Sequence, residues 1–304
     1  MSSLRSRRII FVPGMKPKPP KEVHLRELRR TISAGLFRVQ PSLAKEFAAS
    51  PECLTLVSWT YPFYRRHADI ELDRAGVDAL LHSPEPSAED IAEIDSVARK
   101  LARLLNVLGD MSPWFGRLIA KRDMRLTMSE ARRYLLNRRG IAVEVREMLK
   151  GPLQKAWSNG ERVLLIGHSL GSVIAYDTLW ELSHGDQQNG RIDLFMTLGS
   201  PLGTRFINNR IRGASSHGQR RYPTNIRHWE NFSARAEMTA LHPELRPYFG
   251  EMLELGVLES LTDHVDLYNH FRGDLGLNVH KSYGYLAHSA VAECLAAWLD
   301  SSPA

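Results

Sequence analysis

Short apolar runs alternate along this chain with longer segments of helical periodicity. The runs with the length and composition of buried strands are 9–12, 53–59, 162–166, 192–198 and 226–232. The segments that repeat apolar residues at helical spacing include 23–37, 170–182 and 286–299. Strands that alternate with helices predict an α/β fold with a mostly parallel, doubly wound sheet.

A long helical block interrupts this alternation between the second and third predicted strands. Ser87 and Asp90 fit a helix N-cap and its partner three residues on. Apolar residues then recur at helical spacing from Ile91 to Leu108. This block is too long for one crossover. We therefore expect a helical cap, residues 83–150, inserted in a single domain that spans residues 1–304.

The composition is that of an ordinary globular chain. The sequence has 304 residues, of which 43% are hydrophobic and 24% charged, enough for one large α/β domain. No stretch approaches the roughly 18 consecutive apolar residues that span a bilayer, and the run after Arg8 is too short for a secretion signal. Cys53 and Cys294 provide neither a disulfide framework nor a metal-ligand spacing. We expect a cytoplasmic protein with two buried thiols.

Basic residues give the chain a formal net charge of +6, and the excess is concentrated between Arg99 and Lys150. A basic face could attract anionic lipid, an acidic substrate or nucleic acid, or only keep the chain in solution. Residues 111–122 combine aromatic and aliphatic side chains with basic ones, which fits contact with an anionic membrane surface. No nucleic-acid motif accompanies the charge. We expect no nucleic-acid partner and leave open a peripheral membrane contact.

The motif that carries chemistry is GHSLG, residues Gly167 to Gly171, between a predicted strand and a predicted helix. A serine on such a tight turn is held at the carboxyl edge of the sheet. Gly167 and Gly171 leave room there, because a side chain at either position would collide with a neighbouring strand or helix. The amino end of the helix points at Ser169, so its N–H groups can stabilise a negative oxygen.

GHSLG in this setting resembles the nucleophile elbow of the α/β-hydrolase superfamily, especially its lipase and esterase branches. TLGSPLG, residues 197–203, follows the next strand and is also similar to those sequences. The resemblance is strong over 162–203, moderate over 226–299 and weak over 60–150. It implies an α/β-hydrolase fold in which Ser169 is the nucleophile and His168 lies in the elbow. In this family an acid and then a histidine follow the serine along the chain.

The position of the catalytic histidine in the family points to His280, in LNVHKSYGYLAH just before the terminal helix. His288 falls inside that helix, where it is less free to approach the serine. His242 precedes a proline in a loop, and His264 and His270 lie in an expected short helix. We therefore expect His280 to be the base.

The triad acid has more than one candidate. Similar lipases have W-x-N followed by an aspartate several residues on, and Glu237 stands at that place after Trp229 and Asn231. It departs from the pattern in being a glutamate, which some superfamily members use. We expect Glu237 to be the acid, with Asp263 and Asp266 as the alternatives.

An oxyanion hole needs two backbone N–H groups. The resemblance implies that Leu170, directly after the serine, supplies one of them. The other comes from the loop after the first strand, where Pro13 stands in place of the histidine that is common in the family. We expect the donor to be Met15 rather than Gly14.

These residues predict a serine hydrolase that cleaves a carboxylic ester of a small-molecule substrate through an acyl-enzyme. An acyltransferase or thioesterase would use the same triad. A binding protein that kept the fold and lost the reaction is a further alternative. The acidic and histidine residues of 263–274 lack a recognised metal-ligand spacing, and no nucleotide-binding motif is present. We expect neither a metal nor a cofactor.

Overall fold

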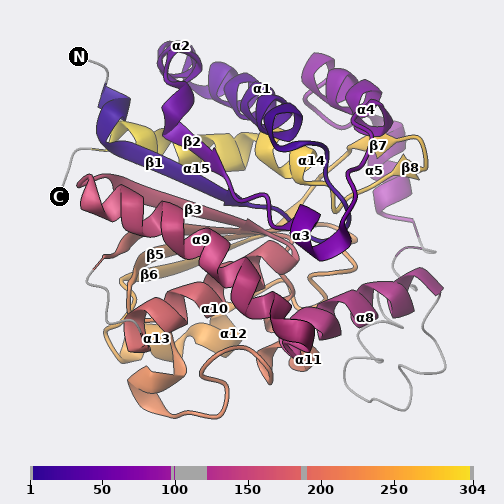
Figure 1. Ribbon diagram of the computed structural model, residues 1–304. Coiled ribbons are helices and arrows are strands. Elements are labelled where there is room, and N and C mark those ends of the chain that lie inside the picture. The colour runs from indigo at the N-terminus through magenta and orange to yellow at the C-terminus, as the bar shows by residue number, and fades with distance from the viewer. Residues whose placement is uncertain (1–2, 97–98, 100–121, 186–189, 302–304) are drawn as a thin grey trace.

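A six-stranded, all-parallel sheet lies at the centre of the described residues in the computed structural model (Figure 1). The structure describes residues 3–96, 99, 122–185 and 190–301. The strands are β1 (Arg7–Val12), β2 (Leu54–Leu56), β3 (Arg162–His168), β4 (Ile192–Leu198), β5 (Ile226–Ala234) and β6 (Ser260–Leu267). The α/β class predicted from the sequence is confirmed.

The strand order, β2-β1-β3-β4-β5-β6, reverses direction between β1 and β3. The chain first moves from β1 to β2 at one edge, and it then adds β3 on the other side of β1 and continues outward. Ligands of open α/β sheets bind beyond the carboxyl ends of the two strands at such a reversal. This topology favours a binding site at the loops that follow Val12 and His168.

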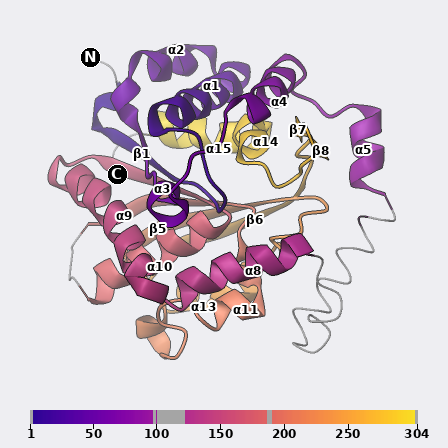
Figure 2. The same cartoon turned by 45° about the vertical axis from the view of Figure 1, so that its right-hand side comes forward.

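Helices lie on both sides of the sheet (Figures 1 and 2). One side carries α1 (Lys21–Val39), α2 (Pro41–Ala49), α14 (Ser282–Ala287) and α15 (Ser289–Asp300), and the other carries α9 (Ile141–Ser158) and α10 (Leu170–His184). Alternate residues of β3 enter two apolar clusters. Leu164 and Ile166 belong to one cluster, and Val163 and Leu165 belong to the other. A strand buried on both faces explains why its sequence is apolar without alternation.

Smaller elements complete the described part of the chain. They are α3 (Thr60–Tyr64), α4 (Glu71–His82), α5 (Ala88–Ile94), α8 (Arg122–Leu135), α11 (Arg205–Asn208), α12 (Arg246–Phe249), α13 (Glu251–Glu254) and the hairpin of β7 (Arg272–Gly273) with β8 (Gly276–Leu277). No helix in the described ranges combines the length and the apolar character needed to cross a membrane.

Two local predictions are wrong. The residues around His264, expected to be helical, form β6, because pairing with β5 satisfies their backbone groups and overrides the local pattern. The expected terminal helix is two helices, since the chain is extended at His288, whose Nδ1 accepts a hydrogen bond from Ala290 N–H at 3.2 Å and caps α15.

The predicted cap is described only at its ends. Ser87 and Asp90 form the expected capping box of α5, whereas residues 100–121, with most of the amphipathic pattern and the segment considered for membrane contact, lie outside the described residues. Residues 141–150 of the predicted range belong to α9, which packs against β1 and β3. This part therefore covers the sheet, and the extent of the cap elsewhere stays a prediction.

Burial of both sheet faces predicts similar costs for two neighbouring truncations. Leu164 and Leu165 are each fully buried, on opposite faces of β3. We expect Leu164→Ala and Leu165→Ala each to lower the free energy of unfolding by about 2–5 kcal/mol. Leu72→Ala, at a side chain that is 55% exposed, is the control and changes it by roughly 0.5 kcal/mol or less. Urea unfolding measures all three. A large loss in only one of the β3 variants would contradict burial on both faces.

Candidate active site

Ser169 occupies a strained turn between β3 and α10. Its backbone angles are φ 53° and ψ −128°, a region that costs about 1–3 kcal/mol for a residue with a side chain. Three hydrogen bonds hold it there. Ser169 N–H donates to Leu198 O at 2.9 Å, and Ser169 O accepts from Ser172 N–H at 3.0 Å and from Ser172 Oγ at 2.6 Å. The serine is thereby fixed at the carboxyl end of β3.

The two glycines of the motif permit this turn sterically. A Cβ at Gly167 would lie 2.5 Å from Ser172 Cα, and a Cβ at Gly171 would lie 2.1 Å from Val12 O. Both contacts are with backbone atoms, which cannot move aside as the end of a flexible side chain can. The first turn of α10 therefore packs directly on the end of β1 and on the strand that precedes it.

His280 is oriented by a buried carboxylate. Its Nδ1 lies 2.7 Å from Glu237 Oε2, and Glu237 is 1% exposed. Tyr285 OH donates to the same oxygen at 3.0 Å, while Thr239 N–H donates to Oε1 at 2.9 Å. Tyr285 OH in turn accepts from Ala234 N–H at 2.8 Å. The end of β5 and helix α14 thus meet at this carboxylate.

Glu237 is the ionised partner of this pair. Burial by itself would raise the pKa of its carboxyl. The charge and the hydrogen bond of His280, together with the donors Thr239 and Tyr285, outweigh burial and lower this pKa below its ordinary value. An ionised carboxylate only accepts hydrogen bonds, so the His280 proton is on Nδ1. The Nε2 lone pair of a neutral His280 then remains available to take a proton from a hydroxyl.

His168 connects the serine turn with His280. Its Nε2 lies 2.7 Å from His280 O, and the two rings are 4.7 Å apart. Because a carbonyl only accepts, Nε2 carries the proton. Burial, followed by the charge of His280, lowers the pKa of His168 well below its usual value, so the ring is neutral. Its Nδ1 is buried and has no hydrogen-bond partner among the described residues. The sequence placed His168 in the elbow but gave no signal for this contact.

Ser169 and His280 therefore belong to one site, joined through His168, which precedes the serine in the chain. Gly199, at the end of β4, lies in the same place, because a Cβ there would be 3.0 Å from both His280 Nδ1 and Glu237 Oε2. Within the described part of the chain, the Ser169 hydroxyl donates no hydrogen bond, to His280 or to another group. Catalytic hydrogen bonds are often long until a substrate binds.

The loop after β1 lies against the serine. A Cβ at Gly14 would be 2.8 Å from Ser169 Cβ. Two side chains from the segment after β2 hold this loop in place. Trp59 Nε1–H donates to Pro13 O at 2.7 Å, and Tyr64 OH accepts from Lys16 N–H at 3.0 Å. Neither Gly14 N–H nor Met15 N–H has an acceptor among the described residues, so both remain candidates for an oxyanion donor.

The second expected donor is the N–H of Leu170. Leu170 is the first residue of α10, and the first four N–H groups of a helix have no partner within it. This donor therefore faces the same end of the sheet as the loop after β1. The two expected donors come from different elements that the close packing at Gly171 holds together.

The alternative acids lie in other surroundings. Asp263 Oδ1 accepts from Asn231 Nδ2 at 2.7 Å and from Leu245 N–H at 2.9 Å, and Oδ2 accepts from Arg246 N–H at 3.0 Å. These bonds tie β5 and β6 to the start of α12. Asp266 is exposed at the end of β6. Of the three candidate acids, the structure brings Glu237 to His280.

The other candidate bases have different partners. His264 Nε2 lies 2.6 Å from Glu230 Oε2, and its ring stacks on Phe232. His270 Nε2 lies 2.9 Å from Ser83 O. His288 caps α15. None of these three contacts involves the serine turn.

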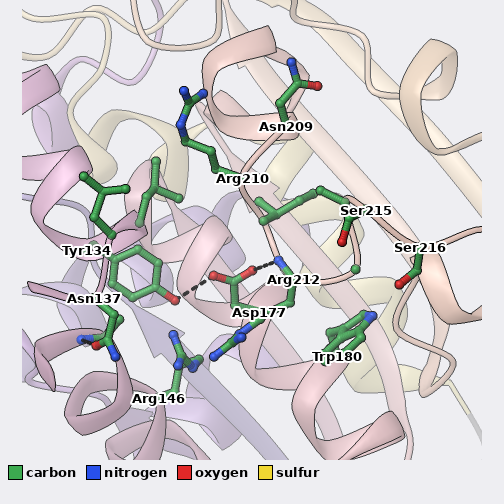
Figure 3. Close-up of a pocket in the computed structure, with 16 residues that line it drawn as sticks. Tyr134, Asn137, Arg146, Asp177, Trp180, Asn209, Arg210, Arg212, Ser215 and Ser216 are labelled. Atoms are coloured by element: carbon green, nitrogen blue, oxygen red, sulfur yellow. Dashed lines mark hydrogen bonds between the residues drawn. The ribbon is translucent and has the colours of Figure 1, made fainter.

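A hollow of about 480 Å³ lies elsewhere, beside α10 (Figure 3). Asp177 in its floor accepts from Tyr134 OH at 3.0 Å and from Arg212 N–H at 2.7 Å. Arg146 and Arg212 both contact Glu181 Oε1, at 3.0 and 2.9 Å. The charges of the floor are therefore paired within the protein. Asp177 lies about two turns along α10 from its amino end, so this hollow is separate from the serine site.

No group of three or more His, Cys, Asp or Glu side chains is arranged to hold a metal ion in the ranges that the structure describes.

The close packing of α10 on β1 predicts a strong effect of one methyl group. Gly171→Ala places its Cβ against Val12 O, so we expect the free energy of unfolding to fall by about 1–3 kcal/mol. Gly151→Ala is the matched control, because a Cβ at that position of α9 meets no atom within 4 Å. It should raise stability by up to about 1 kcal/mol. Equal stabilities of the two variants in urea unfolding would show that the turn is not packed as described.

Comparisons of this chain with models of protein families, with curated proteins and with solved structures give no match.

Proposed function

We propose that this chain is a serine hydrolase of the α/β-hydrolase superfamily, from its lipase and esterase branches, and that it cleaves a carboxylic ester of a small-molecule substrate. The observation that carries the proposal is the strained Ser169 turn beside a His280 ring that a buried Glu237 orients. The strand order and the apolar clusters on both sheet faces support a doubly wound sheet of that superfamily.

In the proposed reaction, Ser169 Oγ attacks the carbonyl carbon of the ester and His280 Nε2 takes the hydroxyl proton. Glu237 holds the imidazolium that results, because its carboxylate is already ionised and bonded to Nδ1. The tetrahedral intermediate carries its negative charge on the former carbonyl oxygen. The N–H groups of Leu170 and Met15 stabilise this oxyanion.

Collapse of the intermediate breaks the ester bond, and His280 Nε2 returns the proton to the leaving alcohol. The acyl group is then bonded to Ser169 Oγ. A water molecule attacks this acyl-enzyme with His280 again as the base, and the acid leaves with the serine restored. An alcohol in place of the attacking water would give acyl transfer, and a thioester in place of the ester would give thioester hydrolysis. Both reactions would use the same residues.

A helical cap over the site is part of the proposal. Arg133 of α8 donates to Phe63 O of α3 at 2.8 Å, and the neighbouring Tyr64 holds the loop at Lys16. The element that follows residues 100–121 is therefore anchored next to the proposed oxyanion loop. We propose that the predicted insertion covers the substrate here, and that its basic and aromatic segment makes any peripheral membrane contact.

Removal of the nucleophile tests the reaction. We expect Ser169→Ala to lower kcat for 4-nitrophenyl butyrate by about 10⁴-fold or more and to abolish labelling by a fluorophosphonate. Ser158→Ala is the matched control, because Ser158 Oγ bonds only Lys155 O at the end of α9, and it should keep both activities. Wild-type protein that neither hydrolyses esters nor reacts with the probe would instead support a binding protein without the reaction.

Two variants, each of which removes the charge of one carboxylate, test which residue is the acid. Glu237→Gln keeps the side-chain size but removes the ionised partner of His280, so we expect kcat to fall by about 10²–10⁴-fold. Asp266→Asn, at the exposed end of β6, should leave kcat within about twofold. Kinetics on folded fractions matched by circular dichroism measure both variants. A larger loss of kcat in Asp266→Asn than in Glu237→Gln would identify Asp266 as the acid instead of Glu237.

A further inference from the structure

Lys18 lies at the end of the proposed oxyanion loop and has no carboxylate in contact among the described residues. Its Nζ donates to Met15 O at 2.8 Å, and it forms no ion pair with any residue that the structure describes. An ammonium group has three donors, so this contact leaves capacity for an acceptor. A half-buried ammonium with no carboxylate in contact is costly unless a ligand or water supplies a further acceptor.

The position of Lys18 is fixed by its backbone. Lys18 O accepts from Ala68 N–H at 3.0 Å, and His67 Nδ1 lies 3.3 Å from the same oxygen. Its Nζ is also close to the expected oxyanion donor. The N and O atoms of Met15 are three bonds apart, which places Nζ within roughly 7 Å of the Met15 N–H.

Further cations surround this point. Lys281 directly follows His280, and its Nζ contacts Asp73 Oδ1 at 2.5 Å. Lys16 is exposed in the same loop as Lys18. The positive charges of both Lys18 and Lys281 contribute to the lowered pKa of His168, beside the serine, after burial and the charge of His280. The proposed ester site therefore has cationic surroundings in which only Lys281 of the three lysines has a close carboxylate.

We infer that the substrate carries a negatively charged group, a carboxylate or a phosphate, and that Lys18 binds this group beside the scissile ester. The inference rests on the proposed ester hydrolysis and specifies its substrate class. The ammonium of Lys18 supplies a charge-assisted hydrogen bond at a distance that a chain of a few carbon atoms spans from the ester carbonyl. In the hollow beside α10, Arg146 and Arg212 already contact Glu181, and that hollow is separate from the serine site.

Lys18 could also act only on the loop, through its bond to Met15 O. The two roles differ in what they do to substrates of different charge. A loop role changes kcat/KM for charged and neutral esters by the same factor. A binding role changes kcat/KM for the charged ester alone, and therefore changes the ratio of the two. The quantity to measure is therefore the ratio of kcat/KM for a charged ester to kcat/KM for a neutral ester of the same length.

The substrates are 4-nitrophenyl hexanoate, the mono-4-nitrophenyl ester of adipic acid, and 3-carboxy-4-nitrophenyl hexanoate. The second adds a carboxylate to the acyl part, and the third adds one to the leaving group. We expect the wild type to prefer one of the charged esters by about 10- to 100-fold. Lys18→Met should reduce that ratio to about one, and Lys18→Arg should retain most of it because the charge is kept.

Lys16→Met is the matched control, since it removes an exposed positive charge from the same loop and should leave most of the ratio. Ser169-dependent hydrolysis with equal ratios in the wild type and Lys18→Met would overturn the inference and leave the proposed function standing. Absence of Ser169-dependent hydrolysis of all three esters would overturn the proposed function, and the inference with it.

The pH dependence gives a second readout. Burial, reinforced by the charge of Lys281, lowers the pKa of Lys18 to about 7. The other charged groups that act on it are Asp73, Lys16 and Glu130. Lys18 is cationic below this pKa and neutral above it, and kcat/KM reports ionisation in the free enzyme. The ratio should fall as the pH rises through 7 in the wild type and stay constant in Lys18→Arg. A wild-type ratio that rises as the pH rises through this range would contradict the inference.

Discussion

The backbone of Ser169 is the constraint on which the site depends. A residue with a side chain adopts φ 53° and ψ −128° only at a cost in conformational free energy. Hydrogen bonds to both the N–H and the carbonyl of Ser169 offset this cost. Leu198 at the end of β4 accepts the Ser169 N–H, while Ser172 donates twice to the Ser169 carbonyl. The end of β4 and the first turn of α10 thus hold the strained backbone of Ser169 in place. This backbone places the Ser169 side chain at the edge of the sheet where the strand order reverses.

Short contacts connect the Ser169 turn with the loop at Met15 and, through His168, with His280 and Glu237. Gly171 allows α10 to touch the end of β1, so the loop at Met15 lies beside the serine. His168 donates to the His280 carbonyl, and Glu237 fixes the His280 ring from the other side. The carboxylate stays ionised although it is buried, because His280, Thr239 and Tyr285 all donate to it. Rigid backbone positions the proposed reacting groups, and one buried carboxylate fixes which nitrogen of the proposed base carries the proton.

The sequence predicts the parts of this arrangement that depend on local pattern. Apolar runs identify the central strands, and two glycines around Ser169 identify the turn, because both signals report burial and close approach. Contacts between distant segments leave no such signal. Nothing local shows that Tyr285 bonds Glu237, that His168 reaches the carbonyl of His280, or that Lys18 turns back to Met15. The prediction of a helix at His264 failed for the same reason, since the partner that makes it a strand is β5.

The measurement that tests the central claim most directly is peptide mapping by mass spectrometry after reaction with diethyl 4-nitrophenyl phosphate. This reagent phosphorylates a serine rapidly where a neighbouring base activates the hydroxyl and an oxyanion site stabilises the transition state. The proposed mechanism predicts one adduct, on the peptide that contains Ser169 and on that residue. An adduct on another residue, or an unmodified protein at a reagent excess that saturates an active serine, would contradict the account.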